Sequence, residues 1–104
     1  MHNYVLDPVV EDELWEIWQF VARDNPAAAT GLVEAAFKTF EMLAANPALG
    51  RPRSFQNPRL RGIRSWRIVG YENYLIFYRP IQKGVRVHHV YHGARDLESL
   101  FRKA

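Results

Sequence analysis

The segment VYHGARDL, residues 90–97, places a histidine, an arginine and an aspartate within five positions. His92, Arg95 and Asp96 are residue types of hydrolytic sites, where an imidazole moves a proton and a guanidinium stabilises negative charge. The same residues also fit a structural role at the end of a strand. Asp96 is placed to cap a short helix over residues 96–102, and Arg95 can bond nearby carbonyls or a helical acid such as Glu13 or Glu16.

A nucleophile is missing from this set. The chain has no cysteine, so it offers neither a thiolate nucleophile nor a thiolate metal site. Ser99 fits a helix cap, and Ser54 and Ser65 have no evident histidine partner. We therefore favour the structural interpretation of residues 90–97.

Three histidines near the end of the chain raise the question of a metal site. In an extended strand, His88 and His92 would point the same way but lie too far apart to bind one ion. No acidic or cysteine cluster completes a ligand set around them and His89. We expect no metal and no cofactor, and partly buried histidines that make hydrogen bonds.

The basic residues of the chain are concentrated in its second half. Residues 1–47 hold eight acidic and two basic side chains, whereas residues 48–104 hold twelve basic and three acidic ones. Such asymmetry indicates a positive surface suited to nucleic acid or an acidic protein partner, or simply a solvated basic face. Six arginines and no acidic residue lie in the segment 51–67, namely Arg51, Arg53, Arg59, Arg61, Arg64 and Arg67.

Length and composition set the class of protein. A chain of 104 residues that is 48% hydrophobic is expected to form a single globular domain over residues 1–104. No basic, apolar leader is visible at the start, and charges interrupt every apolar stretch well short of a membrane span. We expect a soluble, cytoplasmic protein with no membrane contact.

Two helices are predicted after a short N-terminal strand over residues 1–6. Asp7-Pro8 and Asn25-Pro26 both pair a capping residue with a proline at the first helical position. Apolar residues recur at helical spacing after each pair, and RDNP and ANPALGRP end the two helices. The short link between them predicts an antiparallel helical hairpin.

Three strand-like runs follow the arginine-rich loop. They are GIRSWRIV, YLIFYRP and VRVHHVYH, with separations short enough for hairpins. In a regular strand, the side chains of Val85 and Val87 would face one side of the sheet and that of Val90 the other. A β-bulge near His88 and His89 or a sheet apolar on both faces is therefore expected. The order β-α-α-β-β-β with a short C-terminal helix predicts an α+β fold, a helical hairpin on a largely antiparallel sheet.

Some apolar residues fall outside the main stripe of the first helix. Val9 and Phe20 lie on the side shared by Glu13 and Glu16, and Trp15 is also marginal. If exposed, they mark a partner surface, because isolated domains seldom show large apolar patches. The alternative is that they pack against a chain terminus.

Four segments of the chain, in order, resemble the ParE branch of the RelE/ParE superfamily of bacterial toxins. They are P..EDELWEIWQFVARDNPAAA, FEMLAANPALGRPR, LRGIRSWRIVGYENYLIFYRP and VRVHHVYHGARDLESLF, and they span nearly the whole chain. The elements NP.AA, L..NP.LGR.R and HG.RD are specific in combination. The structural signature within these elements consists of Gly50, His92, Gly93, Arg95 and Asp96.

The resemblance implies the toxin of a type II toxin–antitoxin, or plasmid stabilisation, system. ParE-type toxins inhibit DNA gyrase by binding and trapping it on broken DNA, without chemistry of their own. A cognate acidic antitoxin wraps the toxin with a segment that orders on binding, and operator DNA is reached only through that antitoxin. We expect target or antitoxin contacts at the six arginines, Trp15, Phe20, and Leu100 and Phe101 of the terminal helix.

Two alternatives remain open. RelE-type relatives share the fold and cut messenger RNA on the ribosome, and here Arg61 and Arg64 with Tyr91 or His92 would form the catalytic set. The other alternative is a non-toxic module that only binds the antitoxin. We favour the gyrase-binding toxin.

Overall fold

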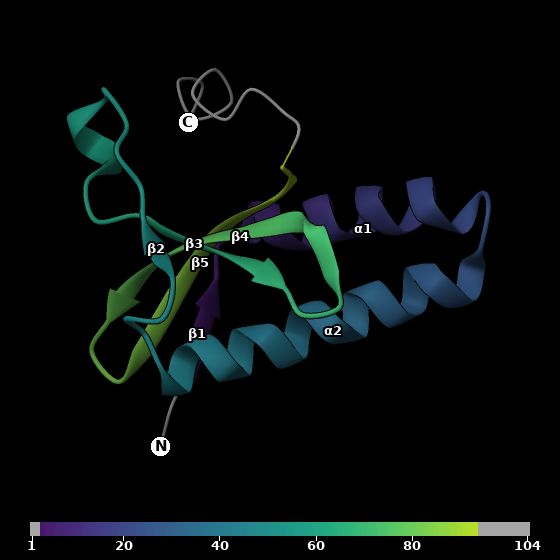
Figure 1. The fold of residues 1–104 in the computed structure, drawn as a ribbon, viewed down its shortest axis with the longest axis horizontal. Coiled ribbons are helices and arrows are strands. Elements are labelled where there is room, and N and C mark those ends of the chain that lie inside the picture. Colours follow the sequence, from purple (N-terminus) through teal and green to yellow (C-terminus); the bar gives the residue numbers. More distant parts are fainter. Residues whose placement is uncertain (1–2, 94–104) are drawn as a thin grey trace.

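The structure, a computed structural model, describes residues 3–93 as a helical hairpin on one face of a five-stranded sheet (Figure 1). The elements are β1 (Asn3–Leu6), α1 (Pro8–Ala22), α2 (Pro26–Ala45), β2 (Arg51–Pro52), the 3-10 helix η1 (Pro58–Leu60), β3 (Arg64–Ile68), β4 (Tyr71–Ile81) and β5 (Gly84–His92). The sheet order is β1-β5-β4-β3-β2, with β1 parallel to β5 and the other pairs antiparallel.

The predicted α+β fold and element order are confirmed. The two-residue strand β2 is an addition that the sequence did not indicate, and β4 begins earlier than predicted, at Tyr71. The terminal helix predicted over residues 96–102 lies outside the described residues.

The two helices begin where the sequence predicts, but only one uses its capping side chain. The Asn25 carboxamide oxygen accepts the Ala28 N–H at 3.0 Å, as expected of an N-cap. Asp7 has the extended backbone of an N-cap, yet its side chain makes no capping hydrogen bond to α1. The predicted capping role of this carboxylate was wrong, because it is taken up by side chains of β5.

The main core lies between the helices and the sheet. Its fully buried members include Val10 of α1, Phe40 of α2 and Tyr78 of β4. Burial of such side chains contributes about 1.5–3 kcal/mol each to folding, so this layer fixes the hairpin on the sheet. No helix in the described part of the chain is both long and apolar enough to cross a membrane.

A smaller core covers the outer face of the sheet, by which we mean the face turned away from α1 and α2. Leu60 and Ile63 of the loop 53–63 pack there against Phe77 and Tyr91. β4 is therefore buried on both faces, and its apolar side chains alternate between the two cores.

Of the two explanations for the irregular alternation in residues 85–92, the β-bulge is present in β5. Phe77 pairs with His89 and Tyr78 with Val87, so His88 is the extra residue. The bulge reverses the side-chain parity of β5, which lets both Val87 and Val90 reach the helix-side core.

The bulge also corrects the expected orientation of the histidines. His92 contacts Tyr74 edge to face at 5.1 Å, on the helix side, whereas His88 bonds Arg79 on the outer face. The prediction that His88 and His92 point the same way was therefore wrong. Among the described residues, no group of three or more histidine or acidic side chains is arranged to hold a metal ion.

Candidate functional site

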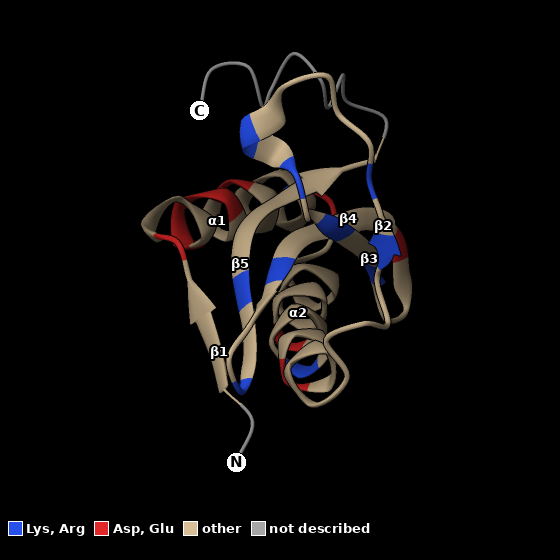
Figure 2. Cartoon of the chain, turned by 90° about the vertical axis from the view of Figure 1, so that its left-hand side faces the viewer, with Lys and Arg blue, Asp and Glu red and all other residues tan. Residues whose placement is uncertain are grey.

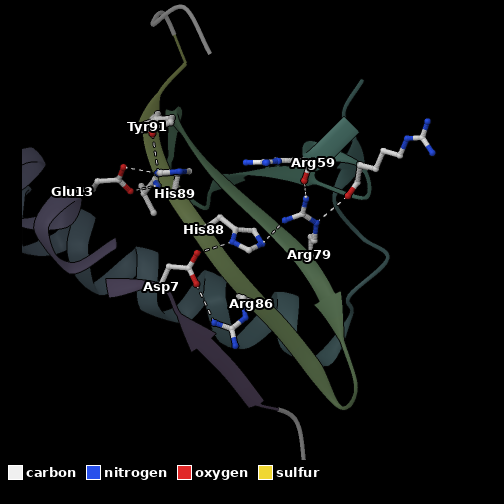
Figure 3. Close-up of polar contacts among 10 residues, drawn as sticks. Asp7, Glu13, Arg59, Arg79, Arg86, His88, His89 and Tyr91 are labelled. Atoms are coloured by element: carbon white, nitrogen blue, oxygen red, sulfur yellow. Dashed lines mark hydrogen bonds and ion pairs between the residues drawn. The ribbon is translucent and has the colours of Figure 1, made fainter. Parts of the chain in front are cut away.

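A chain of polar contacts crosses the outer face of the sheet (Figure 3). One carboxylate oxygen of Asp7 accepts from the Arg86 guanidinium at 3.1 Å, and the other lies 2.8 Å from His88 Nδ1. His88 Nε2 lies 3.0 Å from the Arg79 guanidinium, which also donates to the backbone carbonyls of Arg59 and Arg61. The network thus links the start of α1, β5, β4 and the arginine-rich loop.

The contacts of His88 define its protonation state. A guanidinium can only donate, so Nε2 must accept from Arg79 and Nδ1–H must donate to Asp7. His88 is therefore neutral, and its burial lowers its pKa below the usual 6.5 although Asp7 acts in the opposite direction. Burial alone would raise the pKa of Asp7, but hydrogen bonds from His88 and Arg86 outweigh it and lower that pKa.

Acidification is expected to destabilise the protein through His88. Its pKa is lower in the folded protein than in the unfolded chain, where it is about 6.5, so below that pH the unfolded chain binds more protons. The free energy of unfolding should therefore fall as the pH drops through 6.5, and level off below the folded pKa. Asp7 stays ionised in this window, because its pKa is lowered from 3.8.

Chemical denaturation at a series of pH values tests this expectation. The variant His88→Gln keeps a donor and an acceptor but does not titrate, so its stability should depend less on pH than that of the wild type. Equal pH dependence in the two proteins would show that His88 is not the group responsible.

A second cluster joins α1 to β5. The Glu13 carboxylate accepts the Val90 N–H at 2.9 Å and lies 2.8 Å from His89 Nδ1. The Tyr91 hydroxyl lies 2.8 Å from the same nitrogen, and the two rings stack at 4.8 Å. Because β1 ends at Leu6, this carboxylate caps a strand edge that no neighbouring strand covers there. Glu13 thus has its partners on β5. Arg95, which the sequence suggested as a partner of Glu13 or Glu16, lies outside the described residues.

The six arginines of residues 51–67 do not converge on one point. Arg64 donates to the backbone carbonyls of Ala48 and Gly50, at 3.2 and 2.7 Å, and so holds the loop after α2. Three of the others line one hollow of about 370 Å³ beside β2 and β3, namely Arg51, Arg53 and Arg67. Arg59 and Arg61 have exposed side chains at η1.

The residues of the RelE-like alternative come from the arginine-rich segment and from β5. Arg64 is bonded to carbonyls of the α2–β2 loop, and Arg61 lies next to η1. Tyr91 belongs to the outer-face core, whereas His92 faces the helix side. Tyr91 and His92, the two candidates for one role in that set, thus lie on opposite faces of the sheet.

The apolar residues of α1 that stood outside its main stripe are exposed. Phe20 is 67% exposed and Trp15 is 58% exposed, and Trp15 stacks on Trp18 at 5.5 Å. Phe20 borders a groove of about 270 Å³ between α1 and the end of β5, with Glu13, Glu16, Ile17, Tyr74, Val90, Tyr91 and His92. Trp15 borders another, of about 260 Å³, between α1 and α2, with Glu11, Leu14, Trp18, Val33 and Phe37.

The structure explains why the signature has a glycine at position 50. Its N–H donates to the buried Tyr78 hydroxyl at 2.7 Å, and that hydroxyl donates to the Pro47 carbonyl at 2.8 Å. A Cβ at Gly50 would come within 2.6 and 2.8 Å of two carbons of the Tyr78 ring. Burial raises the pKa of Tyr78, although the Gly50 N–H and Arg64 act against this.

The other signature residues are only partly described. The Gly93 N–H donates to the Asn73 carbonyl at 2.7 Å and closes the end of the β4–β5 pair. Arg95, Asp96, Leu100 and Phe101 lie outside the described residues.

Sequence reasoning missed the roles of Asp7, Glu13 and Arg79. Asp7 and His88 are separated by 81 positions, and the parallel pairing of β1 with β5 brings them together. The bulge then directs His88 toward Arg79. The one sequence signal for this arrangement was the broken alternation of apolar side chains over residues 85–92, which suggested the bulge.

Charge and exposed aromatic residues divide the molecule into two surfaces. Figure 2 shows acidic residues along α1 and basic residues on the strands and on the loop that carries η1. Together with the fold, this defines a small α+β protein with one basic surface and one helical surface that presents aromatic side chains. Such surfaces suit the binding of macromolecules.

Comparisons with known proteins identify the family. The family model for the ParE toxin of the type II toxin–antitoxin system, parDE, matches residues 4–97. This chain therefore belongs to the ParE toxin family. A solved structure titled "Chromosomal ParDE TA system from P. aeruginosa" resembles it with a TM-score of 0.69 and 19% identity, over 88% of this chain and 96% of that chain. That likeness supports the fold, and no match was found among curated proteins.

Proposed function

We propose that this chain is a toxin that inhibits DNA gyrase by binding it, and that a cognate acidic antitoxin neutralises it. The observation that carries this proposal is the match of the ParE toxin family over residues 4–97. We further propose that the whole chain forms one toxin domain, acts in the cytoplasm without a cofactor, and reaches operator DNA only through its antitoxin.

The distribution of charge and exposed aromatic residues supports separate contacts for target and antitoxin. We assign the target contacts to the exposed arginines of the basic surface. Arg64 is left out of this set, because it already donates to two backbone carbonyls. We assign antitoxin contacts to the two grooves beside α1 that Trp15 and Phe20 border, because their exposed rings offer apolar anchors.

Expression in bacteria tests the proposal. We expect growth arrest with DNA-damage signalling, and recovery when the cognate antitoxin is expressed together with the toxin. Immediate translation arrest with cleaved messages would instead support a ribonuclease, and growth without any defect would support a non-toxic antitoxin-binding module.

A further inference from the structure

The hollow beside β2 and β3 has the chemistry of a binding site for phosphodiesters. Arg51, Arg53 and Arg67 line it together with Ser65, Trp66, Glu72 and Leu75. Only one of these residues is acidic, so the hollow carries a positive charge. Arginine is the side chain best suited to a phosphate, because its planar guanidinium can donate two parallel hydrogen bonds.

Two of these arginines are held in place without being neutralised. The Arg53 guanidinium lies over the Phe77 ring at 5.8 Å, and that of Arg67 over the Trp66 ring at 5.0 Å. A cation–π contact positions a cation but leaves its charge available to a ligand. Glu72 lies 3.7 Å from Arg67, but both side chains are largely exposed, so water screens this ion pair.

Other arginines of the sheet are engaged differently. Arg64 and Arg79 donate to backbone carbonyls, and Arg86 is paired with Asp7 at 3.1 Å. These side chains support the fold, whereas Arg53 and Arg67 of the hollow contact aromatic rings and Arg51 is exposed. The contrast marks the hollow as the part of the basic surface that is preorganised for a ligand.

We propose that this hollow binds the sugar–phosphate backbone of single-stranded DNA, at Arg51, Arg53 and Arg67. Guanidinium groups that lie over aromatic rings are among the features with which proteins hold unpaired nucleotides, and Arg53 and Arg67 of the hollow are placed in this way. A peptide that carries only carboxylates would use the cations but has no base to stack on these surfaces. The inference rests on the proposed function, because a toxin that traps gyrase on broken DNA lies next to DNA strands.

Binding of labelled single-stranded DNA to the purified full chain, followed by fluorescence anisotropy at low salt, tests the site. The double variant R51Q/R67Q should bind at least about tenfold more weakly, and the slope of log affinity against log salt should fall by about 1.4. R53Q should weaken binding separately. The matched control R23Q/K38Q removes the same charge from the helices and should bind nearly as well as the wild type.

Several outcomes would overturn the proposal. R51Q/R67Q could bind DNA as tightly as R23Q/K38Q, which would show that only net charge matters. A poly-glutamate peptide could bind the wild type as tightly as DNA, which would make the hollow a carboxylate site. Thermal unfolding of each variant verifies that the fold is intact, as expected for exposed Arg51 and Arg67.

A gyrase assay of the same proteins separates this proposal from the proposed function. DNA binding that depends on Arg51 and Arg67, without gyrase inhibition by the wild type, supports the site and contradicts the function. Gyrase inhibition by the wild type, with unchanged DNA binding by R51Q/R67Q, supports the function and contradicts the site.

Discussion

Gly50→Ala should lower the free energy of unfolding by about 3 kcal/mol, as expected for overpacking of a buried position. The added methyl group would approach the Tyr78 ring within 2.6 Å, and Tyr78 is completely buried. Movement of the ring would also disturb the hydrogen bonds of its hydroxyl to Gly50 and Pro47. Chemical denaturation measures this difference.

A matched glycine provides the control for this prediction. A Cβ at Gly31 in α2 would meet only the hydroxyl end of Tyr71, which can shift, and alanine is the better helix former by about 1 kcal/mol. Gly31→Ala should therefore be neutral or stabilising. A loss below about 1 kcal/mol for Gly50→Ala, the low end of the overpacking range, would contradict the proposed reason for this signature glycine.

Trp15→Ala and Phe20→Ala should each weaken antitoxin binding by about 2 kcal/mol or more, which is roughly thirtyfold in Kd. Both rings are exposed in the free chain, so their removal should cost little stability. Each borders a groove that could receive an apolar side chain of the antitoxin. Calorimetric titration of the antitoxin into each variant gives the affinity.

Val69→Ala is the matched control for the two aromatic variants. Val69 is an exposed apolar residue, 56% accessible, and it lies away from both grooves. This variant should bind the antitoxin like the wild type. Unchanged affinity in Trp15→Ala and Phe20→Ala would place the antitoxin elsewhere on the toxin.

Local sequence patterns predicted most of the fold. The two capping residues followed by proline located the helices, and the short separations of the last strands predicted their hairpins. The strand β2 was not predictable, because two residues carry too little pattern. The parallel β1–β5 pair joins distant segments, so no local pattern could reveal that Asp7 would bind Arg86 and His88.

The candidate site was less predictable than the fold. Composition located the arginine-rich segment, but it could not distinguish Arg64, which bonds two carbonyls, from Arg51 and Arg67, which line the hollow. That distinction depends on strand parity and on the course of the loop after α2. Helical counting placed Trp15 and Phe20 outside or at the margin of the main stripe of α1 but left their exposure open, and the structure shows that both are exposed.

A supercoiling assay with purified DNA gyrase tests the central claim most directly. The purified chain should inhibit supercoiling and accumulate cleaved DNA, and prior mixing with the cognate antitoxin should restore supercoiling. Normal supercoiling, without cleaved DNA, in the presence of excess folded toxin would contradict the proposed function.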